Sequence, residues 1–132
     1  MIHLDYSADS DIDGAIFIDF HDADGNIGEI SADGNTTTFA PTSDYRLKED
    51  LKEIPDAISV INQLKIYDFK WKKSDKRGFG VLAHEAQEII PQAVTGVKDG
   101  DRNQCADYSK FVPHLIKAVQ ELSAKVTALE SA

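Results

Sequence analysis

The sequence predicts an α+β protein: a β-rich segment over residues 1–42, then a mixed helix-and-strand part over residues 43–132 that ends in a long helix. Turn signals and strand-like runs fill the first segment, helical periodicity begins after Ser43, and the chain closes on a heptad pattern. The charge changes at the same place. Residues 1–42 hold nine acids and no Lys or Arg, whereas residues 43–132 hold fourteen charges of each sign. We therefore expect two short modules joined at Thr42–Ser43.

The first segment alternates strand-like runs with turns. Turn signals recur about every ten residues, at Asp13-Gly14, Asp24-Gly25-Asn26 and Asp33-Gly34-Asn35. The runs between them are expected to be strands: Ala15–Phe20, Ile27–Ser31 and Thr36–Phe39. The tetrapeptide Ala-Asp-Gly-Asn also occurs twice, at 23–26 and 32–35. A segment this short favours a repetitive β structure that buries its faces against identical chains.

The middle of the chain reads as short alternating elements. We expect a turn or short helix over Leu47–Ile54, then a helix that runs to about Leu64 with Pro55 in its first turn. Aromatic residues alternate with polar ones over Tyr67–Trp71, which predicts a strand with one aromatic face. The charged loop Lys72–Arg77 follows. After it we expect a strand at Phe79–Leu82 and a helix at Ala83–Ile90 that is stopped by Pro91. Two further strands, Val94–Val97 and Gln104–Tyr108, are expected to form a hairpin.

The C-terminal segment carries the clearest helical signal. Its apolar residues follow spacings of three and four: Val112, Leu115, Val119, Leu122, Val126 and Leu129. This is a heptad seam with Val at one core position and Leu at the other, and Pro113 is compatible with a first helical turn. The pattern also fits a helix packed on its own domain. Fewer than three heptads do not hold a coiled coil without other contacts.

Composition excludes several function classes. The single Cys105 rules out an internal disulfide and fits a reducing compartment. No apolar run is long enough to span a membrane, and no basic stripe exists outside Lys70–Arg77, so we expect neither a membrane nor a nucleic-acid partner. His114 has no ligand spacing around it, and the acidic loops near Asp11 and Asp22 lack the distal Glu of calcium loops. We expect no metal and no cofactor.

Ser43 and Lys48 are the candidate nucleophile and base. A lysine deprotonates a serine hydroxyl only if its pKa falls well below about 10.4, through burial or a neighbouring cation such as Arg46. The alternative is that Ser43 simply caps the next helix. His84 and Glu85 lie in a strand-to-helix turn and could orient a base, although a helix-start Glu is also favoured by the helix dipole alone.

Three segments resemble a known family. Thr42–Glu49 resembles the start of the intramolecular chaperone domain at the C-terminus of phage tailspikes, tail fibres and endosialidases, which is classed with self-cleaving serine peptidases of the S74 type. Gly80–Gln87 resembles that family's Gly-Phe-Ile-Ala-Gln-Glu-Val-Gln segment, with Pro91 in the expected place. Asp107–Leu122 resembles its closing helix.

The resemblance implies a homotrimer, joined through the C-terminal helix and the β-rich segment, that aligns three fibre chains and then cuts itself away. Ser43 matches the nucleophile and Lys48 its partner, with cleavage between Thr42 and Ser43. Glu85 matches a recurrent family Glu with a supporting role, and His84 stands where the family more often has Gln.

The family also implies a location and leaves alternatives. Assembly would occur in the host cytoplasm, after which the N-terminal part stays in the virion tail and the chaperone part is released. A host-cell receptor would concern the parent fibre only. Two other interpretations are a permanent trimerisation module that does not cleave, and a receptor-binding fibre tip.

Overall fold

The computed structural model describes residues 15–33 and 36–132, and the chain divides into two compact units, Met1–Leu51 and Lys52–Ala132. The predicted turn at Asp13-Gly14 and most of the one at Asp33-Gly34-Asn35 lie outside the described residues. The predicted division after Thr42 falls inside the first unit and stays a prediction. In the described part, no helix has both the length and the apolar character needed to cross a membrane.

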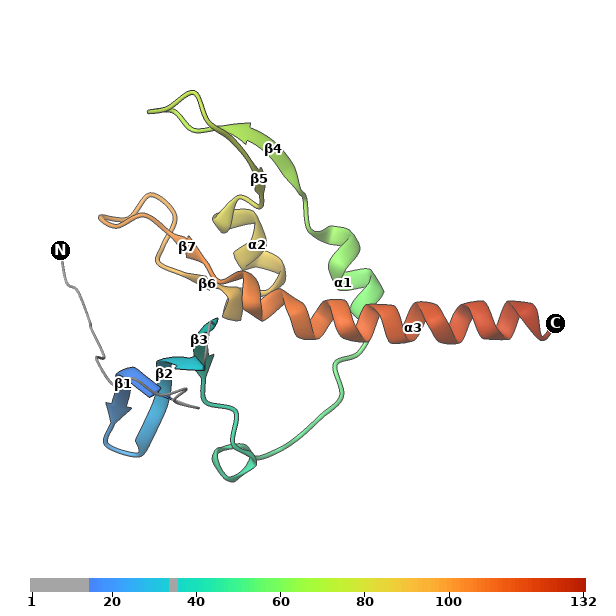
Figure 1. The fold of residues 1–132 in the computed structure, drawn as a ribbon. Coiled ribbons are helices and arrows are strands. Elements are labelled where there is room, and N and C mark those ends of the chain that lie inside the picture. Colours follow the sequence, from blue (N-terminus) through green and yellow to red (C-terminus); the bar gives the residue numbers. More distant parts are fainter. Residues whose placement is uncertain (1–14, 34–35) are drawn as a thin grey trace. The chain divides into compact units, whose positions relative to one another are not determined.

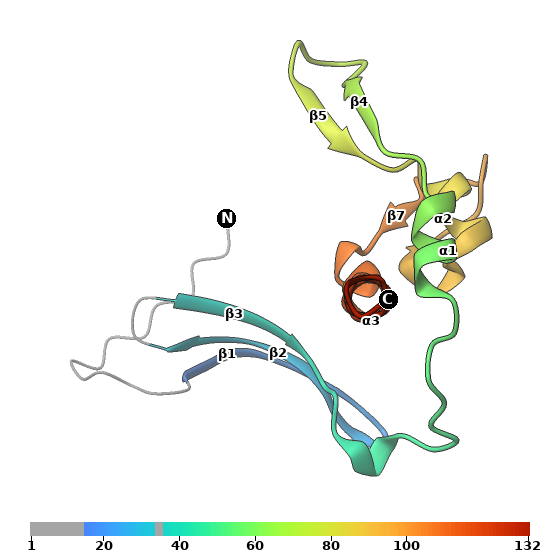
Figure 2. The ribbon, with the colours of Figure 1, turned by 90° about the vertical axis from the view of Figure 1, so that its right-hand side faces the viewer.

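A three-stranded antiparallel sheet makes up most of the first unit. Its strands are β1 (Ala15–Asp22), β2 (Gly25–Asp33) and β3 (Thr36–Pro41), in the order β1-β2-β3, and they lie side by side in Figure 2. All three predicted strands are confirmed. Large apolar side chains of this sheet remain exposed: Ile16, Ile18, Phe20, Ile27 and Phe39. The described part of this unit therefore buries no large apolar side chain.

The second unit contains mixed short elements and one long helix (Figure 1). In order these are α1 (Ala57–Gln63), β4 (Tyr67–Lys70), β5 (Arg77–Gly80), α2 (Ala83–Ile89), β6 (Val94–Thr95), β7 (Cys105–Ala106) and α3 (Val112–Glu130). The strands β4 and β5 pair antiparallel, as do β6 and β7. An α+β architecture with small sheets and a C-terminal helix is thus confirmed.

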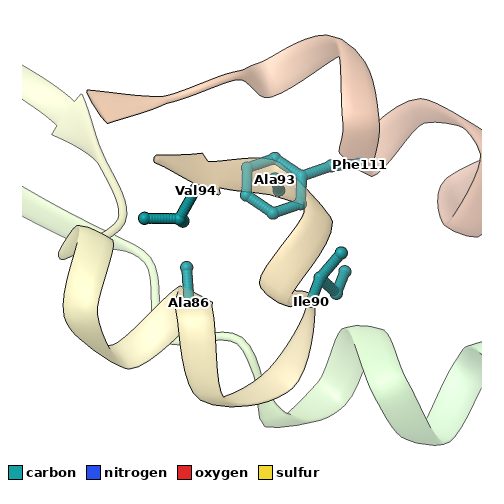
Figure 3. Close-up of a cluster of buried hydrophobic side chains, with 5 residues drawn as sticks. All are labelled: Ala86, Ile90, Ala93, Val94 and Phe111. Atoms are coloured by element: carbon teal, nitrogen blue, oxygen red, sulfur yellow. The ribbon is translucent and has the colours of Figure 1, made fainter. Parts of the chain in front are cut away.

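A small apolar core holds the second unit together. It joins side chains of α2, of the 3₁₀ turns Pro91–Ala93 and Tyr108–Phe111, and of β6: Ala86, Ile90, Ala93, Val94 and Phe111. These side chains point toward one another in Figure 3. Ile90 is the only large side chain that is fully buried among the described residues, and the other members of the core are mostly small. Such a core provides modest hydrophobic stabilisation.

Helix α1 is fixed to α3 by polar contacts. The backbone N–H groups of Ala57 and Ile58 donate to Glu121 Oε1 and Oε2 at 3.0 and 3.1 Å. Asp56, which precedes α1, has φ +46° and makes no side-chain cap hydrogen bond, so a carboxylate from α3 caps this helix instead. Lys117 Nζ also donates to Glu53 Oε2 at 2.9 Å. The two N–H donors, Ile58 first, hold the pKa of Glu121 below its usual value.

Several predicted boundaries were wrong. Helix α1 begins at Ala57, because the left-handed backbone of Asp56 keeps Pro55 outside the first turn. Over Leu47–Ile54 the structure has no helix beyond the end of a 3₁₀ turn at Tyr45–Leu47. Strand β5 includes Arg77 and ends at Gly80, because the N–H of Val81 donates to the Tyr108 hydroxyl rather than to a strand partner. The predictions for α2, the second hairpin and α3 are confirmed, with shorter hairpin strands.

Candidate functional site

The structure brings Ser43 and Lys48 into direct contact. Lys48 Nζ lies 2.6 Å from Ser43 Oγ, and it also donates to the Ser43 carbonyl oxygen at 3.2 Å. This meets the distance requirement for a nucleophile and its base. Both side chains are exposed in the single chain, so water surrounds the pair.

A tight turn explains how residues five apart meet. The 3₁₀ turn Tyr45–Leu47 follows directly after the extended residue Asp44. The N–H of Leu47 donates to the Asp44 carbonyl at 3.2 Å, and the N–H of Lys48 donates to the Tyr45 carbonyl at 3.1 Å. These bonds reverse the chain after Asp44, and Lys48 consequently reaches back to Ser43.

Asp44, not Ser43, caps this turn. Its Oδ1 accepts a hydrogen bond from the Arg46 N–H at 2.8 Å, which is the contact expected of an N-cap carboxylate. The alternative role of Ser43 as a helix cap is therefore wrong. Sequence reasoning gave Asp44 no role. The signal was available, since Asp is a favoured cap residue and stands directly before a short turn.

Arg46 also binds Asp44 through its side chain. Its Nε lies 3.0 and 3.1 Å from the two Asp44 carboxylate oxygens, and one terminal nitrogen lies 2.6 Å from Oδ2. The Arg46 side chain, and then its backbone N–H, hold the pKa of Asp44 below its usual value. The described hydrogen bonds of this guanidinium all go to Asp44. Arg46 was predicted to act on Lys48 as a neighbouring cation, but its charge is paired with the Asp44 carboxylate.

Thr42, the residue before Ser43, is held to the sheet by its backbone N–H. The N–H of Thr42 donates to the Ile27 carbonyl at 3.2 Å, immediately beyond β3. An open cavity of about 480 Å³ lies beside Thr42, and its lining is mostly polar: Asp24, Asn26, Thr42, Asp44, Arg46 and Leu47. The β1–β2 turn and the turn after Asp44 thus both border this cavity.

His84 and Glu85 lie in the second unit, in the first turn of α2. Glu85 Oε2 accepts a hydrogen bond from the Tyr67 hydroxyl at 2.8 Å, and Oε1 lies 3.8 Å from Lys65 Nζ. The hydrogen bond to Glu85 is the main reason that the pKa of Tyr67 is raised. Glu85 therefore links β4 to α2, and any role of Glu85 or His84 toward Ser43 remains a prediction. Within the described residues, no cluster of His, Cys, Asp and Glu is suited to a metal ion.

Comparisons with known proteins find a family match for part of the chain and several similar tail fibre proteins. Residues 43–95 match the peptidase S74 family model, described as chaperone of endosialidase. Long tail fiber protein Gp37 of Enterobacteria phage Ox2 is 32% identical over 106 residues, which cover 74% of this chain and 42% of that protein. Gp37 of Enterobacteria phage K3 is 32% identical over 96 residues, covering 67% and 8%. A protein named "Probable tail fiber protein" of Escherichia phage Phieco32 is 34% identical over 100 residues, covering 70% and 14%.

The chain thus spans less than half the length of each of these relatives. The family match begins at Ser43, the residue whose hydroxyl contacts Lys48, and it covers the turn that joins them. The resemblance inferred from the sequence is confirmed. Over residues 43–95, this chain is similar to the family described as chaperone of endosialidase.

Proposed function

We propose that this chain is part of a phage tail-fibre protein in which residues 43–132 act as an intramolecular chaperone and then release themselves by cutting the Thr42–Ser43 bond. The family match and the named relatives support the chaperone role. One observation carries the self-cleavage: Ser43 Oγ lies 2.6 Å from Lys48 Nζ, directly after the bond to be cut. The cut N-terminal part would belong to the virion tail, assembled in the host cell.

The cleavage chemistry uses groups of this chain and one water molecule. Neutral Lys48 takes the proton of the Ser43 hydroxyl, and Oγ attacks the carbonyl carbon of Thr42. A C–O bond forms, the C–N bond breaks, and the proton passes to the departing Ser43 nitrogen. The resulting ester between Thr42 and Ser43 Oγ is hydrolysed by water, which leaves a carboxyl group on Thr42 and a free amine on Ser43. Attack from the adjacent residue has a high effective concentration.

Assembly would control the timing of this reaction. Lys48 is exposed in the single chain. Burial is one of the conditions that favour a neutral lysine able to accept a proton. Attack through a small ring also requires a distorted peptide bond, which surrounding structure must hold. We propose that three associated chains supply both the burial and the distortion, so that cleavage follows trimer formation.

Exposed apolar surface supports association through α3. The whole heptad seam is exposed in the single chain, with relative exposures from 47% to 77%: Val112, Leu115, Val119, Leu122, Val126 and Leu129. Helix α1 packs on α3 elsewhere, around the buried Ala118 and the capping Glu121. The seam is therefore not used by the chain's own core, which favours a coiled coil of several copies over the alternative of an internally packed helix.

The charge distribution explains why residues 1–42 would need a chaperone to assemble. Three copies of residues 1–42 carry only negative charge apart from histidines, so electrostatic repulsion opposes their association. The neutral second segment can hold the three copies together until their strands pair. Once the strands have paired, their unfolding is slow, and the fibre end therefore stays assembled after the chaperone part has been released.

The decisive experiment follows the purified full chain by denaturing gel and intact mass. Wild type should yield fragments 1–42 and 43–132. Ser43→Ala and Lys48→Ala should stay whole, Ser43→Cys should keep some cleavage because a thiol is also a nucleophile, and the remote control Ser74→Ala should cleave like wild type. A wild-type chain that forms trimers and remains whole would overturn self-cleavage.

A second variant tests the link to assembly. Leu122→Asp places a charge in the middle of the seam, and we expect it to prevent trimer formation and to slow cleavage strongly. Light scattering after size exclusion reports the oligomeric state, and the gel reports the cut. A monomeric Leu122→Asp chain that cleaves at the wild-type rate would contradict the proposed coupling.

A permanent trimerisation module remains the second candidate, because both side chains of the pair are exposed in the single chain. It would be favoured by wild-type trimers whose Thr42–Ser43 bond persists, as it does in Ser43→Ala.

A further inference from the structure

We infer that Asp44 and Arg46 are positioning residues for cleavage: Asp44 holds the turn that places Lys48 on Ser43, and Arg46 holds the Asp44 carboxylate in place. This inference rests on the proposed function. It assigns to Asp44 a role that the sequence pattern did not suggest, and it moves Arg46 from a direct partner of Lys48 to a partner of Asp44.

The turn has little else to hold it. Only three residues form the 3₁₀ turn, and such turns have poorer hydrogen-bond geometry than an α-helix. The apolar side chains around it are exposed, with relative exposures of 80% for Tyr45, 59% for Leu47 and 80% for Leu51. Packing therefore contributes little in the single chain. The side-chain cap from Asp44 to the Arg46 N–H reinforces the two backbone bonds that direct Lys48 back to Ser43.

The Asp44 charge creates a conflict that Arg46 offsets. Lys48 is near enough to the Asp44 carboxylate to contribute, after Arg46, to the lowered pKa of Asp44. In general, an unpaired carboxylate beside a lysine favours the ammonium form, which cannot act as a base. Asp24, from the β1–β2 turn, borders the same cavity as Asp44 and Arg46. The two-pronged contact with the Arg46 guanidinium compensates the Asp44 charge while leaving its capping oxygen in place.

Three single variants separate these roles in the full chain. Asp44→Ala removes both the cap and the charge, and cleavage should slow about tenfold, the cost of losing a good cap. Asp44→Asn keeps a capping oxygen and should retain more of the rate. Arg46→Gln keeps the backbone cap but leaves the carboxylate unpaired beside Lys48. Arg77→Gln is the matched control, because it breaks an exposed Arg–Asp pair with Asp68 in the β4–β5 hairpin.

The pH dependence of the cleavage rate distinguishes a positioning role from loss of structure, because unfolding alone would lower the rate without shifting the pH of half-maximal rate. Cleavage rates of the trimeric fraction are measured between about pH 6 and pH 10, where an activated lysine would titrate. The pH of half-maximal rate should rise by about 0.5 in Arg46→Gln and fall by a similar amount in Asp44→Asn, an effect the size of a surface ion pair. The double variant should return toward wild type, because both charges are gone.

Hydroxylamine identifies the affected step, since it cleaves an accumulated ester. If the pair positions Ser43 for attack, hydroxylamine should not restore cleavage in Asp44→Ala. Rates within about twofold of wild type in all variants, with unchanged pH profiles, would overturn the inference while leaving self-cleavage intact. An uncut wild type would instead remove the proposed function itself. Should Asp44→Ala fail to form trimers, the opposite pH shifts of the other two variants still decide the question.

Discussion

Replacing Gly80 by Ala should disturb the junction between β5 and the start of α3. A Cβ atom at this position would lie 2.2 Å from the Tyr108 hydroxyl oxygen and 3.6 Å from the Phe69 ring. That hydroxyl accepts the hydrogen bond of the Val81 N–H at 3.1 Å. The Tyr108 ring also makes an edge contact with the core residue Phe111, at 5.6 Å between ring centroids. Tyr108 must therefore move, and it takes these contacts with it.

The expected cost follows from those contacts. Losing the hydrogen bond costs about 1 kcal/mol, and a weakened ring contact adds up to about 1 kcal/mol. Ala returns about 0.4–1 kcal/mol by restricting the unfolded chain. Gly80→Ala should thus destabilise the unit by about 1 kcal/mol. Tyr108→Phe alone should cost about 1 kcal/mol for the lost hydrogen bond. In the Tyr108→Phe background the clashing oxygen is absent, and Gly80→Ala should then be neutral or slightly stabilising.

A double-mutant cycle tests this reasoning. All four chains carry Ser43→Ala so that none is cut, and urea unfolding is followed by the fluorescence of Trp71, which lies just after β4 in the same unit. We expect a coupling free energy of about 1 kcal/mol or more, beyond the 0.3–0.5 kcal/mol scatter of independent sites. Costs of Gly80→Ala and Tyr108→Phe that simply add would show that the hydroxyl does not occupy the space beside Gly80.

Two further stability predictions use the same assay. Ile90→Ala should lower the free energy of unfolding by about 2–5 kcal/mol, because it removes most of a buried side chain of the core in Figure 3. Ile90→Val should lower it by only about 0.5–1.5 kcal/mol. Equal effects of the two variants would mean that the core collapses around the smaller side chain. Glu121→Gln should lower the melting temperature near neutral pH, because the cap of α1 loses its charge. The lowered pKa of Glu121 means that its contribution is present above its unfolded pKa of about 4.3 and is lost as the pH falls through the lower folded value. The melting temperatures of wild type and Glu121→Gln should therefore converge in acid, and a gap that widened instead would reverse this assignment.

Composition and periodicity predicted the elements better than their ends. The strands of the first segment were expected from strand-like composition between turn signals, and helix α3 from apolar spacings of three and four residues. The start of α1 was misplaced because its cap comes from Glu121, far along the chain, and no local signal announces it. The end of β5 was misplaced for the same reason, since Tyr108 takes the N–H of Val81. Contacts between distant segments set these boundaries.

In the candidate site, too, local features were predictable from the sequence and contacts between distant segments were not. Ser43 and Lys48 were found from a motif, and the structure brings them together as local turn geometry allows. The capping role of Asp44 was not predicted, although an Asp directly before a short turn is a local sequence signal for a cap. The contact of Thr42 with Ile27 depends on the pairing of β2 and β3 and was not predictable from spacing alone.

The order of residues along the chain makes the proposed reaction a single event. Ser43, its base and the positioning pair all follow the cleavage bond, so they leave with the chaperone part when the bond breaks. The fibre part keeps Thr42 and the β1–β2 turn that borders the cavity, but no nucleophile remains beside them. The cut therefore cannot be repeated on the fibre. In the structure the Thr42 N–H donates to the Ile27 carbonyl, so the residue before the proposed cut is held by β2 immediately beyond the paired end of β3.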